Sequence, residues 1–395
     1  MARIQTFNKI ASEGIALLES RGHEVGPDVT NPEGILVRSA KLHDLDFGPE
    51  LRAIARAGAG VNNIPVDRCT EQGIVVFNTP GSNANSVKEL VVAGLMLSSR
   101  RIMEGCAWVQ SLDPSAVDVT KEVESGKSAF AGPEIAGKRL GVIGLGSIGV
   151  MVANAGVALD MEVVGFDPFL SIRSAWGLSR TVARADSLEA LLAEADYVTI
   201  HVPLSEETRN IIGAKQLQKI REGARILNFA RDGLVDEDAL RDALDSGKVS
   251  RYVTDFPTAA LHGHPGVIAV PHLGASTPEA ETNSALMAAQ ELADFLEQGN
   301  IRKSVNFPEC AIACGEGDRL VVANRNIPNM LGQITTVLAQ ADLNISHMIN
   351  EHRGDLAYTL IDLENPIQET TVESIRSIEG VIMARMIPGR AACAD

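Results

Sequence analysis

The sequence lacks the excess of basic residues that a nucleic-acid-binding surface requires. Its 395 residues contain 35 Lys and Arg against 51 Asp and Glu, which gives a formal net charge of −16 at pH 7. A ligand that carries phosphate therefore needs a local cationic site instead of a broadly positive surface. This charge balance argues against nucleic acid as a partner.

Cysteine is also scarce, and its spacing is not that of a zinc site. Only Cys310 and Cys314 are close in the chain, and no second pair completes a set of metal ligands. We interpret the five cysteines as reduced thiols of a cytoplasmic protein, and we predict no metal site. They are Cys69, Cys106, Cys310, Cys314 and Cys393.

No segment has the features of a secretory signal or a membrane span. Residues 1–20 carry charges of both signs and have no apolar core followed by a cleavage site. Residues 140–159 are uncharged and long enough to span a bilayer, but glycines interrupt them at 141, 144, 146, 149 and 156. A strand, a glycine turn and a helix explain that stretch, so we expect a soluble protein with no membrane partner.

The order of strand and helix patterns predicts an α/β protein with two doubly wound parallel sheets. In the first ninety residues, strands at 35–38, 53–56 and 74–78 alternate with helical patterns. From residue 139 the alternation is regular, as in a dinucleotide-binding domain. We expect six strands there, at 139–144, 162–167, 197–202, 224–230, 251–256 and 267–271, and helices at 147–159, 187–195, 214–221 and 236–246.

The C-terminal third begins with a helix and ends with a small separate domain. Ser276-Thr277-Pro278-Glu279 is typical of a helix start, and the helix should run to about Gln298. A linker at 299–317 follows. The remaining pattern is a ferredoxin-like βαββαβ order. Its predicted strands are 319–324, 344–350, 357–363 and 380–387, and its helices are 329–341 and 371–378.

A glycine motif, Gly144-x-Gly146-x-x-Gly149, lies between a predicted strand and a predicted helix. The first glycine permits a tight turn, the second lets backbone N–H groups approach a pyrophosphate, and the third allows close helix packing. Asp167 ends the next strand, where a carboxylate accepts hydrogen bonds from a ribose and repels a 2′-phosphate. We therefore predict NAD as the cofactor, in preference to NADP.

Several strings, in this order along the chain, resemble the D-2-hydroxy-acid dehydrogenase family. They are 56-RAGAGVNN-63, 78-NTPG-81, 201-HVPL-204, 228-NFARDG-233 and 271-PHLGAST-277. The resemblance covers residues 1–310 and is strongest to the branch that oxidises 3-phospho-D-glycerate. The tail resembles an ACT domain, a regulatory module that often binds an amino acid. The implied domains are a substrate-binding domain (1–92 and 276–307), an NAD-binding Rossmann domain (93–275) and an ACT-like domain (316–390).

The resemblance implies two catalytic residues. Arg231 matches the arginine that holds the substrate carboxylate, for which a planar guanidinium is suited. His272 matches the acid/base that removes the hydroxyl proton as hydride leaves C2.

The resemblance also implies sets of binding residues, listed here by ligand. The cofactor set adds Ser147, Ile148, His201, Val202, Pro203, Thr208, Asn228, Phe229, Ala230, Asp255, His272, Gly274 and Ala275 to the glycine motif and Asp167. The substrate set is Arg38, Ser39, Lys41, Ala59, Gly60, Val61, Asn78 and Arg231, with Arg38 and Lys41 as candidates for a substrate phosphate. The effector set is Asn324, Asn326, Asn344 and Ile345, with serine as the first effector to try.

The chain departs from the family at one catalytic position. The family orients its histidine with a glutamate, and the corresponding position here is Ala259. A neighbouring carboxylate stabilises an imidazolium, so its loss should let substrate oxidation extend to lower pH. We expect catalysis to persist with the Arg231–His272 pair and another group in place of the glutamate.

Three alternatives stay open at this point. In the first alternative, the dehydrogenase acts on a different small acid, such as glyoxylate, hydroxypyruvate or D-lactate, since a fold does not fix a substrate. The absent glutamate instead favours a non-catalytic NAD(H)-sensing binding protein. The ACT-like tail either binds serine or only dimerises; in each case we expect a homodimer or a larger closed assembly.

Overall fold

The computed structural model describes residues 1–313 and 315–389, which form two compact units. Residues 1–82 and the described residues from 281 onward make the first unit, and residues 83–280 make the second. Cys314, Cys393 and the end of the predicted ACT-like domain at residue 390 lie outside the described residues.

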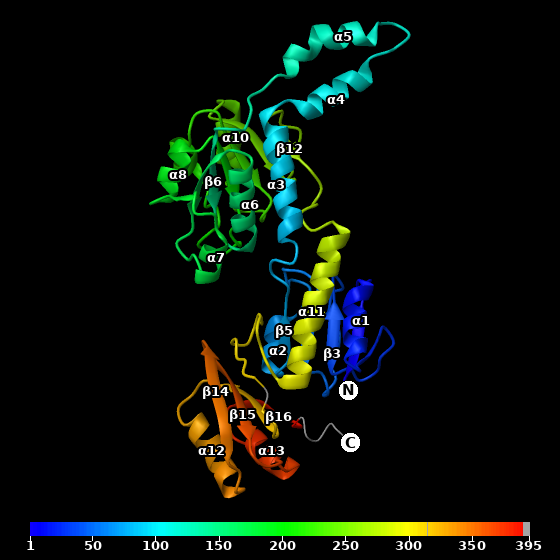
Figure 1. Ribbon diagram of the computed structural model, residues 1–395, viewed down its shortest axis with the longest axis vertical. Helices are drawn as coiled ribbons and strands as arrows, with labels where there is room; N and C mark the ends of the chain where they lie inside the picture. The colour runs from blue at the N-terminus through cyan, green and yellow to red at the C-terminus, as the bar shows by residue number, and fades with distance from the viewer. Residues whose placement is uncertain (314, 390–395) are drawn as a thin grey trace. The chain divides into compact units, whose positions relative to one another are not determined.

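The first unit contains a five-stranded parallel sheet in the order β2-β1-β3-β4-β5. The three strands expected from the sequence are β3 (Gly34–Val37), β4 (Ala53–Arg56) and β5 (Val75–Phe77), whereas β1 (Arg3–Phe7) and β2 (Glu24–Gly26) were not predicted. Helices α1 (Ser12–Ser20), α2 (Val66–Glu71) and α11 (Pro278–Gln298) accompany this sheet (Figure 1). Buried apolar side chains cover both of its faces, as the predicted doubly wound arrangement requires.

The second unit contains a seven-stranded parallel sheet in the order β12-β11-β10-β9-β6-β7-β8. All six predicted strands are present: β6 (Arg139–Ile143), β7 (Glu162–Phe166), β9 (Tyr197–Ile200), β10 (Ala224–Asn228), β11 (Val249–Thr254) and β12 (Val267–Ala269). The two-residue edge strand β8 (Ala183–Arg184) was not predicted. The strand order is that of a doubly wound dinucleotide-binding fold, which confirms the prediction.

Helices cover both faces of this sheet (Figure 1). Those predicted in the sequence analysis are α6 (Ser147–Ala158), α8 (Leu188–Glu194), α9 (Ala214–Lys219) and α10 (Glu237–Asp245). Helix α3 (Ala84–Ser99) also packs against this sheet. Helix α7 (Ile172–Gly177) is additional. An arm made of α4 (Ile102–Ser111), α5 (Val119–Gly126) and the 3-10 turn η1 (Lys127–Phe130) leaves the sheet and contains no buried residue.

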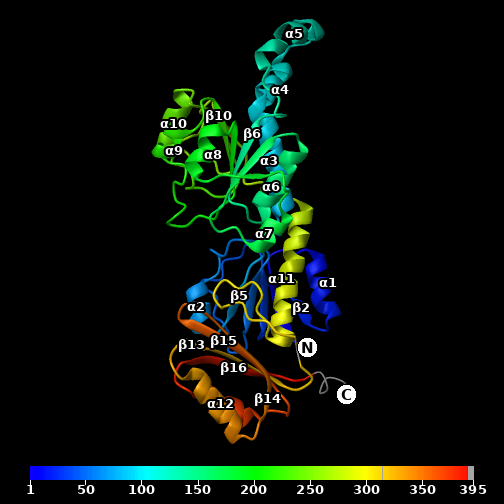
Figure 2. The same ribbon diagram turned by 60° about the vertical axis from the view of Figure 1, so that its left-hand side comes forward.

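The C-terminal segment of the first unit has the predicted βαββαβ order. It runs β13 (Arg319–Arg325), α12 (Met330–Gln340), β14 (Ile345–Arg353), β15 (Leu356–Leu363), α13 (Glu369–Arg376) and β16 (Val381–Ile387). The four strands form an antiparallel sheet in the order β14-β15-β13-β16. One face packs against α12 and α13, and the other joins the core that contains α11 and β5 (Figure 2).

This antiparallel sheet also supplies hydrogen-bond donors to the C-terminal end of α11. The last carbonyl groups of a helix have no partner within the helix. Arg385 donates to the carbonyl of Phe295 at 2.5 Å, and Arg319 donates to that of Gln298 at 3.0 Å. The Tyr358 hydroxyl donates to the carbonyl of Gly299 at 2.7 Å. At the other end of α11, the Thr277 hydroxyl accepts from Ala280 N–H at 3.1 Å, which confirms the predicted helix start.

Within the described residues, no helix combines the length and the apolar character that a membrane span needs. The uncharged stretch at 140–159 is β6, a glycine turn and α6, as the sequence predicts.

Candidate active site

The predicted site residues of the second unit gather at one edge of the seven-stranded sheet. In a parallel sheet the carboxyl ends of all strands meet at the same edge, which is where doubly wound folds bind ligands. Each of the following residues comes within three positions of the end of its strand: Gly144 after β6, Asp167 after β7, His201 after β9, Arg231 after β10, Asp255 after β11 and His272 after β12.

The glycine motif has the geometry of a pyrophosphate-binding turn. Gly144 has φ of +87°, and a Cβ there would lie 2.7 Å from the carbonyl oxygen of His201. A Cβ on Gly149 would lie 1.9 Å from the carbonyl oxygen of Gly144, so only glycine lets α6 begin this close to the turn. A Cβ on Gly146 would meet nothing within 4 Å. The space next to Gly146 and the N-terminus of α6 with Ser147 and Ile148 therefore fit an anionic group of a dinucleotide.

Asp167 is fixed beside this turn. Its Oδ2 accepts from the N–H of Leu145 at 2.8 Å, and its Oδ1 accepts from the N–H of Phe169 at 2.8 Å. A carboxylate has further lone pairs, so it can still accept hydrogen bonds from a ribose. The position fits the predicted contact with the adenosine ribose.

His201 lies at the base of the turn and is held neutral. Its backbone N–H donates to the carbonyl of Ile143, and its Nε2 lies 2.9 Å from the Thr199 hydroxyl. Nδ1 is buried and has no hydrogen-bond partner in the part of the chain that the structure describes. Burial lowers the pKa of His201 to about 3 because the interior disfavours the imidazolium.

The other predicted residues of this loop organise the backbone. The Thr208 hydroxyl donates to the carbonyl of Pro203 at 2.6 Å and accepts from the N–H of Ser205 at 2.8 Å. A Cβ on Gly144 would lie 2.8 Å from Cγ1 of Val202. The 201–208 loop and the glycine turn are therefore packed together at the sheet edge.

A turn after β10 presents Arg231. The buried Asn228 side chain donates to the carbonyl of Arg231 at 2.9 Å and accepts from the N–H of Ala230 at 3.2 Å. It also lies 3.2 Å from the hydroxyl of Tyr252. The Arg231 guanidinium is exposed and donates to the carbonyl of Ala230 at 2.7 Å. Phe229 is buried in the core, so its contribution to the turn is packing.

Asp255 and His272 come from neighbouring strands and interact. Asp255 is 1% exposed, and its Oδ2 accepts from the N–H of Gly274 at 3.1 Å. Burial raises the pKa of the Asp255 carboxyl, while the Gly274 N–H and the charge of protonated His272 act in the opposite direction. Its Oδ1 is buried and has no hydrogen-bond partner among the described residues, which leaves an acceptor available for an amide donor. His272 itself is exposed.

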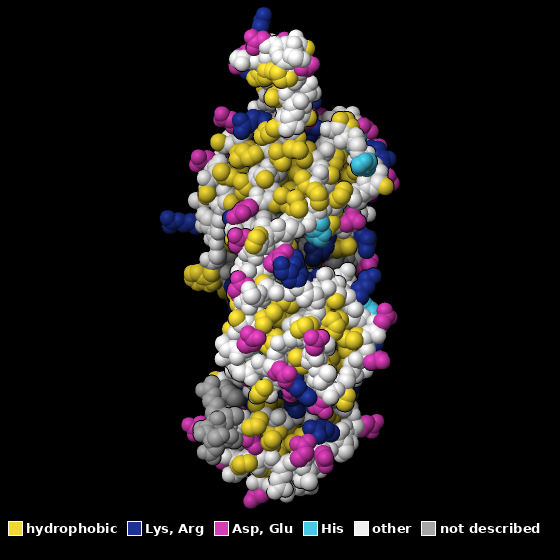
Figure 3. Space-filling model, turned by 90° about the vertical axis from the view of Figure 1, so that its right-hand side faces the viewer, with side chains coloured by type: hydrophobic (Ala, Val, Ile, Leu, Met, Phe, Trp, Pro, Cys, Tyr) yellow, Lys and Arg dark blue, Asp and Glu magenta, His cyan; other side chains and the backbone are white. Residues whose placement is uncertain are grey.

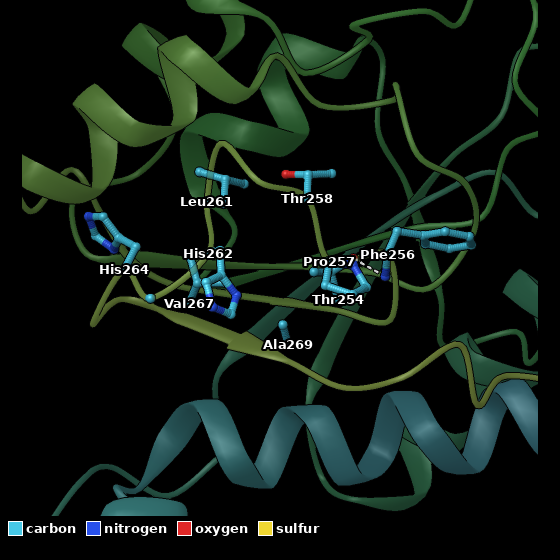
Figure 4. A pocket seen from close by; sticks show the side chains of 10 residues that line it. Thr254, Phe256, Pro257, Thr258, Leu261, His262, His264, Val267 and Ala269 are labelled. Atoms are coloured by element: carbon cyan, nitrogen blue, oxygen red, sulfur yellow. Dashed lines mark hydrogen bonds between the residues drawn. The ribbon is translucent and has the colours of Figure 1, made fainter.

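A cavity of about 150 Å³ lies beside the loop that contains Ala259. Figure 4 shows Thr258, Leu261 and His262 around it, with Phe256 at one end. The Thr258 hydroxyl is buried and has no hydrogen-bond partner within residues 1–313 and 315–389. Both ring nitrogens of His264 are already engaged, one with Asp245 and the other with the N–H of Gly266, so they are not available to bind a group inside the cavity.

In the first unit, the predicted substrate residues lie on loops after β3, β4 and β5. Arg38 forms an ion pair with Glu281 at 2.7 Å, and Asn78 donates to the carbonyl of Ala59 at 2.6 Å. The backbone N–H of Ser39 donates to the Asn8 side chain at 3.1 Å. Lys41 is exposed, and Gly60 and Val61 are half-buried.

The sequence analysis missed Arg56 as an organiser of these loops. Its Nε donates to the carbonyl of Arg38 at 2.9 Å, and its Nη1 donates to the carbonyl of Gly60. A Cβ on Gly60 would lie 3.2 Å from that Nη1. The only signal in the sequence was its place at the start of the 56–63 string.

The predicted effector residues occupy different environments in the C-terminal segment. Asn324 is 2% exposed and donates to the carbonyl of Arg325. Its buried Oδ1 has no hydrogen-bond partner among the residues that the structure describes. Asn326 is exposed and donates to the carbonyl of Gly354 at 3.3 Å. Asn344 accepts from the N–H of Glu364 through its carbonyl, and Ile345 packs against the core of this segment.

Comparisons with known proteins agree with this arrangement. Residues 93–274 match the model of the D-isomer-specific 2-hydroxyacid dehydrogenase NAD-binding domain. The chain is 31% identical over 358 residues to D-3-phosphoglycerate dehydrogenase of Haemophilus influenzae, covering 87% of this chain and 83% of that protein. It is 34% identical over 327 residues to D-3-phosphoglycerate dehydrogenase of Synechocystis, covering 78% of this chain.

The chain spans 56% of the Synechocystis protein's length and 53% of that of a relative from Archaeoglobus fulgidus. Among solved structures, it resembles NAD+-bound 3-phosphoglycerate dehydrogenase of Entamoeba histolytica with a TM-score of 0.59 and 26% identity. That match covers 77% of this chain and 98% of the other.

Proposed function

The chain belongs to the D-isomer-specific 2-hydroxyacid dehydrogenase family, and we propose that it oxidises 3-phospho-D-glycerate to 3-phosphohydroxypyruvate with NAD as the hydride acceptor. This reaction is the proposed first step of serine biosynthesis. The observation that carries the proposal is the convergence of the glycine turn, Arg231 and His272 on one edge of the seven-stranded sheet. The names of the relatives support the choice of substrate.

Arg231 is the proposed carboxylate-binding group. Its guanidinium is exposed to solvent at the end of a turn that the buried Asn228 holds in place. A planar guanidinium grips a carboxylate with two parallel hydrogen bonds, and this fixes the orientation of the neighbouring C2. Such positioning lowers the entropic part of the barrier to hydride transfer.

His272 is the proposed acid/base. Neutral imidazole accepts the proton of the C2 hydroxyl as the C–O double bond forms, and imidazolium returns it in the reverse reaction. Bound NAD+ supplies the acceptor for the hydride that leaves C2. Asp255, whose free Oδ1 fits an amide donor, is the proposed contact for the nicotinamide carboxamide. It is also the carboxylate whose charge interacts with His272 in the absence of a glutamate at position 259.

The binding sets assigned from the sequence are kept as part of this proposal. Arg38 and Lys41 are the cations proposed for the substrate phosphate, and Arg38 is already oriented by Glu281. We propose the three-domain division stated above, with the ACT-like segment as a regulatory domain that responds to serine through Asn324 and its neighbours. The unpartnered, buried Oδ1 of Asn324 supports an effector that donates a hydrogen bond there.

We also propose that the protein forms a homodimer or a larger homo-oligomer through the second unit. The arm exposes Ile102 (37%), Met103 (54%), Val109 (43%) and Val117 (37%). Hydrophobic side chains also gather on one face of this unit below the arm (Figure 3). Exposed apolar side chains that gather on one face are typical of a subunit interface.

A panel of acids tests the substrate assignment. NADH consumption is measured with 3-phosphohydroxypyruvate, glyoxylate, hydroxypyruvate and pyruvate, with and without serine. We expect the highest kcat/KM with the phosphorylated acid and a lower rate in the presence of serine. A preference for an unphosphorylated acid contradicts the substrate, and turnover of none of them favours the NAD(H)-sensing alternative.

A further inference from the structure

The cavity beside the loop that connects β11 to β12 is distinct from the proposed cofactor and substrate contacts. Its volume is about 150 Å³, and its apolar wall comes from Leu261, Val267 and Ala269. No residue assigned above to NAD or to the acid is among the described residues that line it. A molecule in this cavity therefore does not compete for the contacts proposed for either ligand.

The loop is held in place around the cavity. Arg241 of α10 donates to the carbonyl of Ala260, and His264 Nε2 lies 3.1 Å from Asp245 Oδ1. The Leu261 side chain is 5% exposed and belongs to the core of the second unit. The loop cannot move inward to fill the cavity without breaking these contacts.

Two side chains of this loop have hydrogen-bonding capacity that the described residues leave unused. The buried Thr258 hydroxyl has no hydrogen-bond partner among them, and the His262 ring forms no hydrogen bond or ion pair with them. Figure 4 shows the Thr258 hydroxyl pointing toward the side of Leu261, with the ring of His262 on the same side of the loop. A buried hydroxyl without a partner is costly, and a ligand that hydrogen-bonds to it removes this cost.

The lining also limits the charge and the size of a ligand. Among the described residues that line the cavity, none is Lys, Arg, Asp or Glu. A charged molecule would lose its hydration there without meeting an opposite charge. A cavity of this volume with apolar walls can hold a molecule of the size of benzene. The fitting ligand is therefore small, uncharged and mostly apolar, with one group that can hydrogen-bond to Thr258.

One end of the cavity reaches the proposed acid/base. Phe256 lines that end, and its ring lies against the imidazole of His272, with ring centroids 4.7 Å apart. Aromatic pairs have preferred relative orientations, so a displacement of one ring changes the surroundings of the other.

We propose that this cavity is a second binding site, for a small uncharged molecule that joins an apolar body to one hydroxyl group, and that its occupancy acts on His272 through Phe256. Binding at this site is independent of the proposed function. Only the consequence for catalysis rests on the role proposed for His272.

Calorimetric titration with phenol and toluene tests the binding site, because the two probes differ only in a hydroxyl against a methyl group. We expect the native protein to bind phenol. Thr258→Val exchanges the hydroxyl for a methyl group, so it should weaken phenol binding about fivefold or more and leave toluene binding within about twofold. Ala269→Leu fills the cavity and should abolish binding of phenol. Ala259→Leu, on the same loop but outside the lining, is the matched control and should bind phenol as the native protein does.

NMR signals of the histidine rings test the effect on His272 without turnover. Phenol should move the Cε1–H resonance of His272, which its loss in His272→Gln identifies, and should not move it in Ala269→Leu. Phe256→Leu removes the ring contact, so it should reduce this movement by at least about half while phenol still binds.

Three results overturn the inference. They are no binding of phenol to the native protein, binding that Ala269→Leu retains, and a His272 resonance that stays in place while phenol binds. A native protein that turns over none of the acids but gives the expected phenol results contradicts the proposed function alone, so the two failures are distinguishable.

Discussion

The ring of Phe256 lies against the imidazole of His272, with ring centroids 4.7 Å apart and an angle of 52° between the planes. Phe256 directly follows Asp255, and the Asp255 carboxylate accepts from the N–H of Gly274, two residues after His272. The segment after β11 therefore orients the loop after β12 through one ring contact and one hydrogen bond. We propose that this arrangement holds the imidazole in place of the family's glutamate, to which the resemblance assigns position 259.

Restoring a carboxylate at that position should change the pH dependence of the reaction. A nearby carboxylate stabilises imidazolium, and imidazolium cannot accept the hydroxyl proton. In Ala259→Glu, the acid limb of kcat/KM for 3-phosphoglycerate oxidation should move up by about one pH unit relative to the native protein. The neutral Ala259→Gln variant is the control and should keep the native profile. An identical acid limb in all three proteins contradicts this account of the missing glutamate.

Two glycines of the phosphate turn should respond differently to alanine. Gly149→Ala places a Cβ 1.9 Å from a carbonyl oxygen, so the turn or α6 must shift, at a cost of about 1–3 kcal/mol in unfolding free energy. Gly146→Ala meets nothing in the protein and should leave stability within about 0.5 kcal/mol. Because the same space fits the pyrophosphate, Gly146→Ala should still weaken NADH binding about tenfold or more. Thermal denaturation and NADH fluorescence titration measure the two effects, and equal stability of both variants would contradict the turn geometry.

Because His201 is held neutral in the fold, we expect the free energy of unfolding to decrease in acid. Burial lowers its pKa from 6.5 to about 3, so between these values the unfolded chain binds a proton that the folded chain does not. The contribution of His201 to the free energy of unfolding is fully present above about pH 6.5 and decreases as the pH falls below that value. Between about pH 7 and about pH 5 the loss amounts to about 2 kcal/mol of unfolding free energy.

Urea unfolding at both pH values measures this loss. His201→Gln should reduce the difference between the two pH values, whereas the exposed His43→Gln should not. A difference that is the same in the native protein and in His201→Gln would show that other groups cause the acid sensitivity.

A buried ion pair should dominate the stability of the C-terminal segment. Arg319 and Asp362 are 0% and 2% exposed, 2.5 Å apart, and directly opposite each other in the β13–β15 register. Removing one partner leaves a buried charge, so Asp362→Ala should lower the unfolding free energy by about 3–5 kcal/mol. The exposed pair Arg376–Glu369 is the matched control, and Glu369→Ala should cost less than about 1 kcal/mol. Similar losses in chemical denaturation of the two variants would contradict this difference.

Most of the fold could be predicted from the sequence because its signals are local. The glycine motif, the strand–helix alternation and the cap at Thr277 each depend on residues that are near one another in the chain. The strand β8 was missed because two residues carry no periodicity, and its role depends on pairing with β7. The same limit applies to Arg319, which meets Asp362 only through the register of an antiparallel sheet.

In the candidate site, too, residues with a local sequence signal were predicted, and residues that depend on long-range contacts were not. Gly144, Asp167, Arg231 and His272 were found because each follows a strand in a recognisable string, and the order of the strands brings them to one edge. Arg56 was not assigned a role, since its hydrogen bonds to the carbonyls of Arg38 and Gly60 depend on loops that only the folded unit defines. The catalytic and binding roles assigned to these residues stay predictions.

The most direct test of the central claim is kcat/KM for the reduction of 3-phosphohydroxypyruvate by NADH, compared between the native protein and Arg231→Ala. The account predicts turnover by the native protein and a loss of at least about 100-fold in the variant, with the dissociation constant of NADH within about twofold of native. Native turnover that Arg231→Ala retains, or no native turnover despite NADH binding, would contradict the claim that the guanidinium of Arg231 positions a 2-hydroxy acid for hydride transfer.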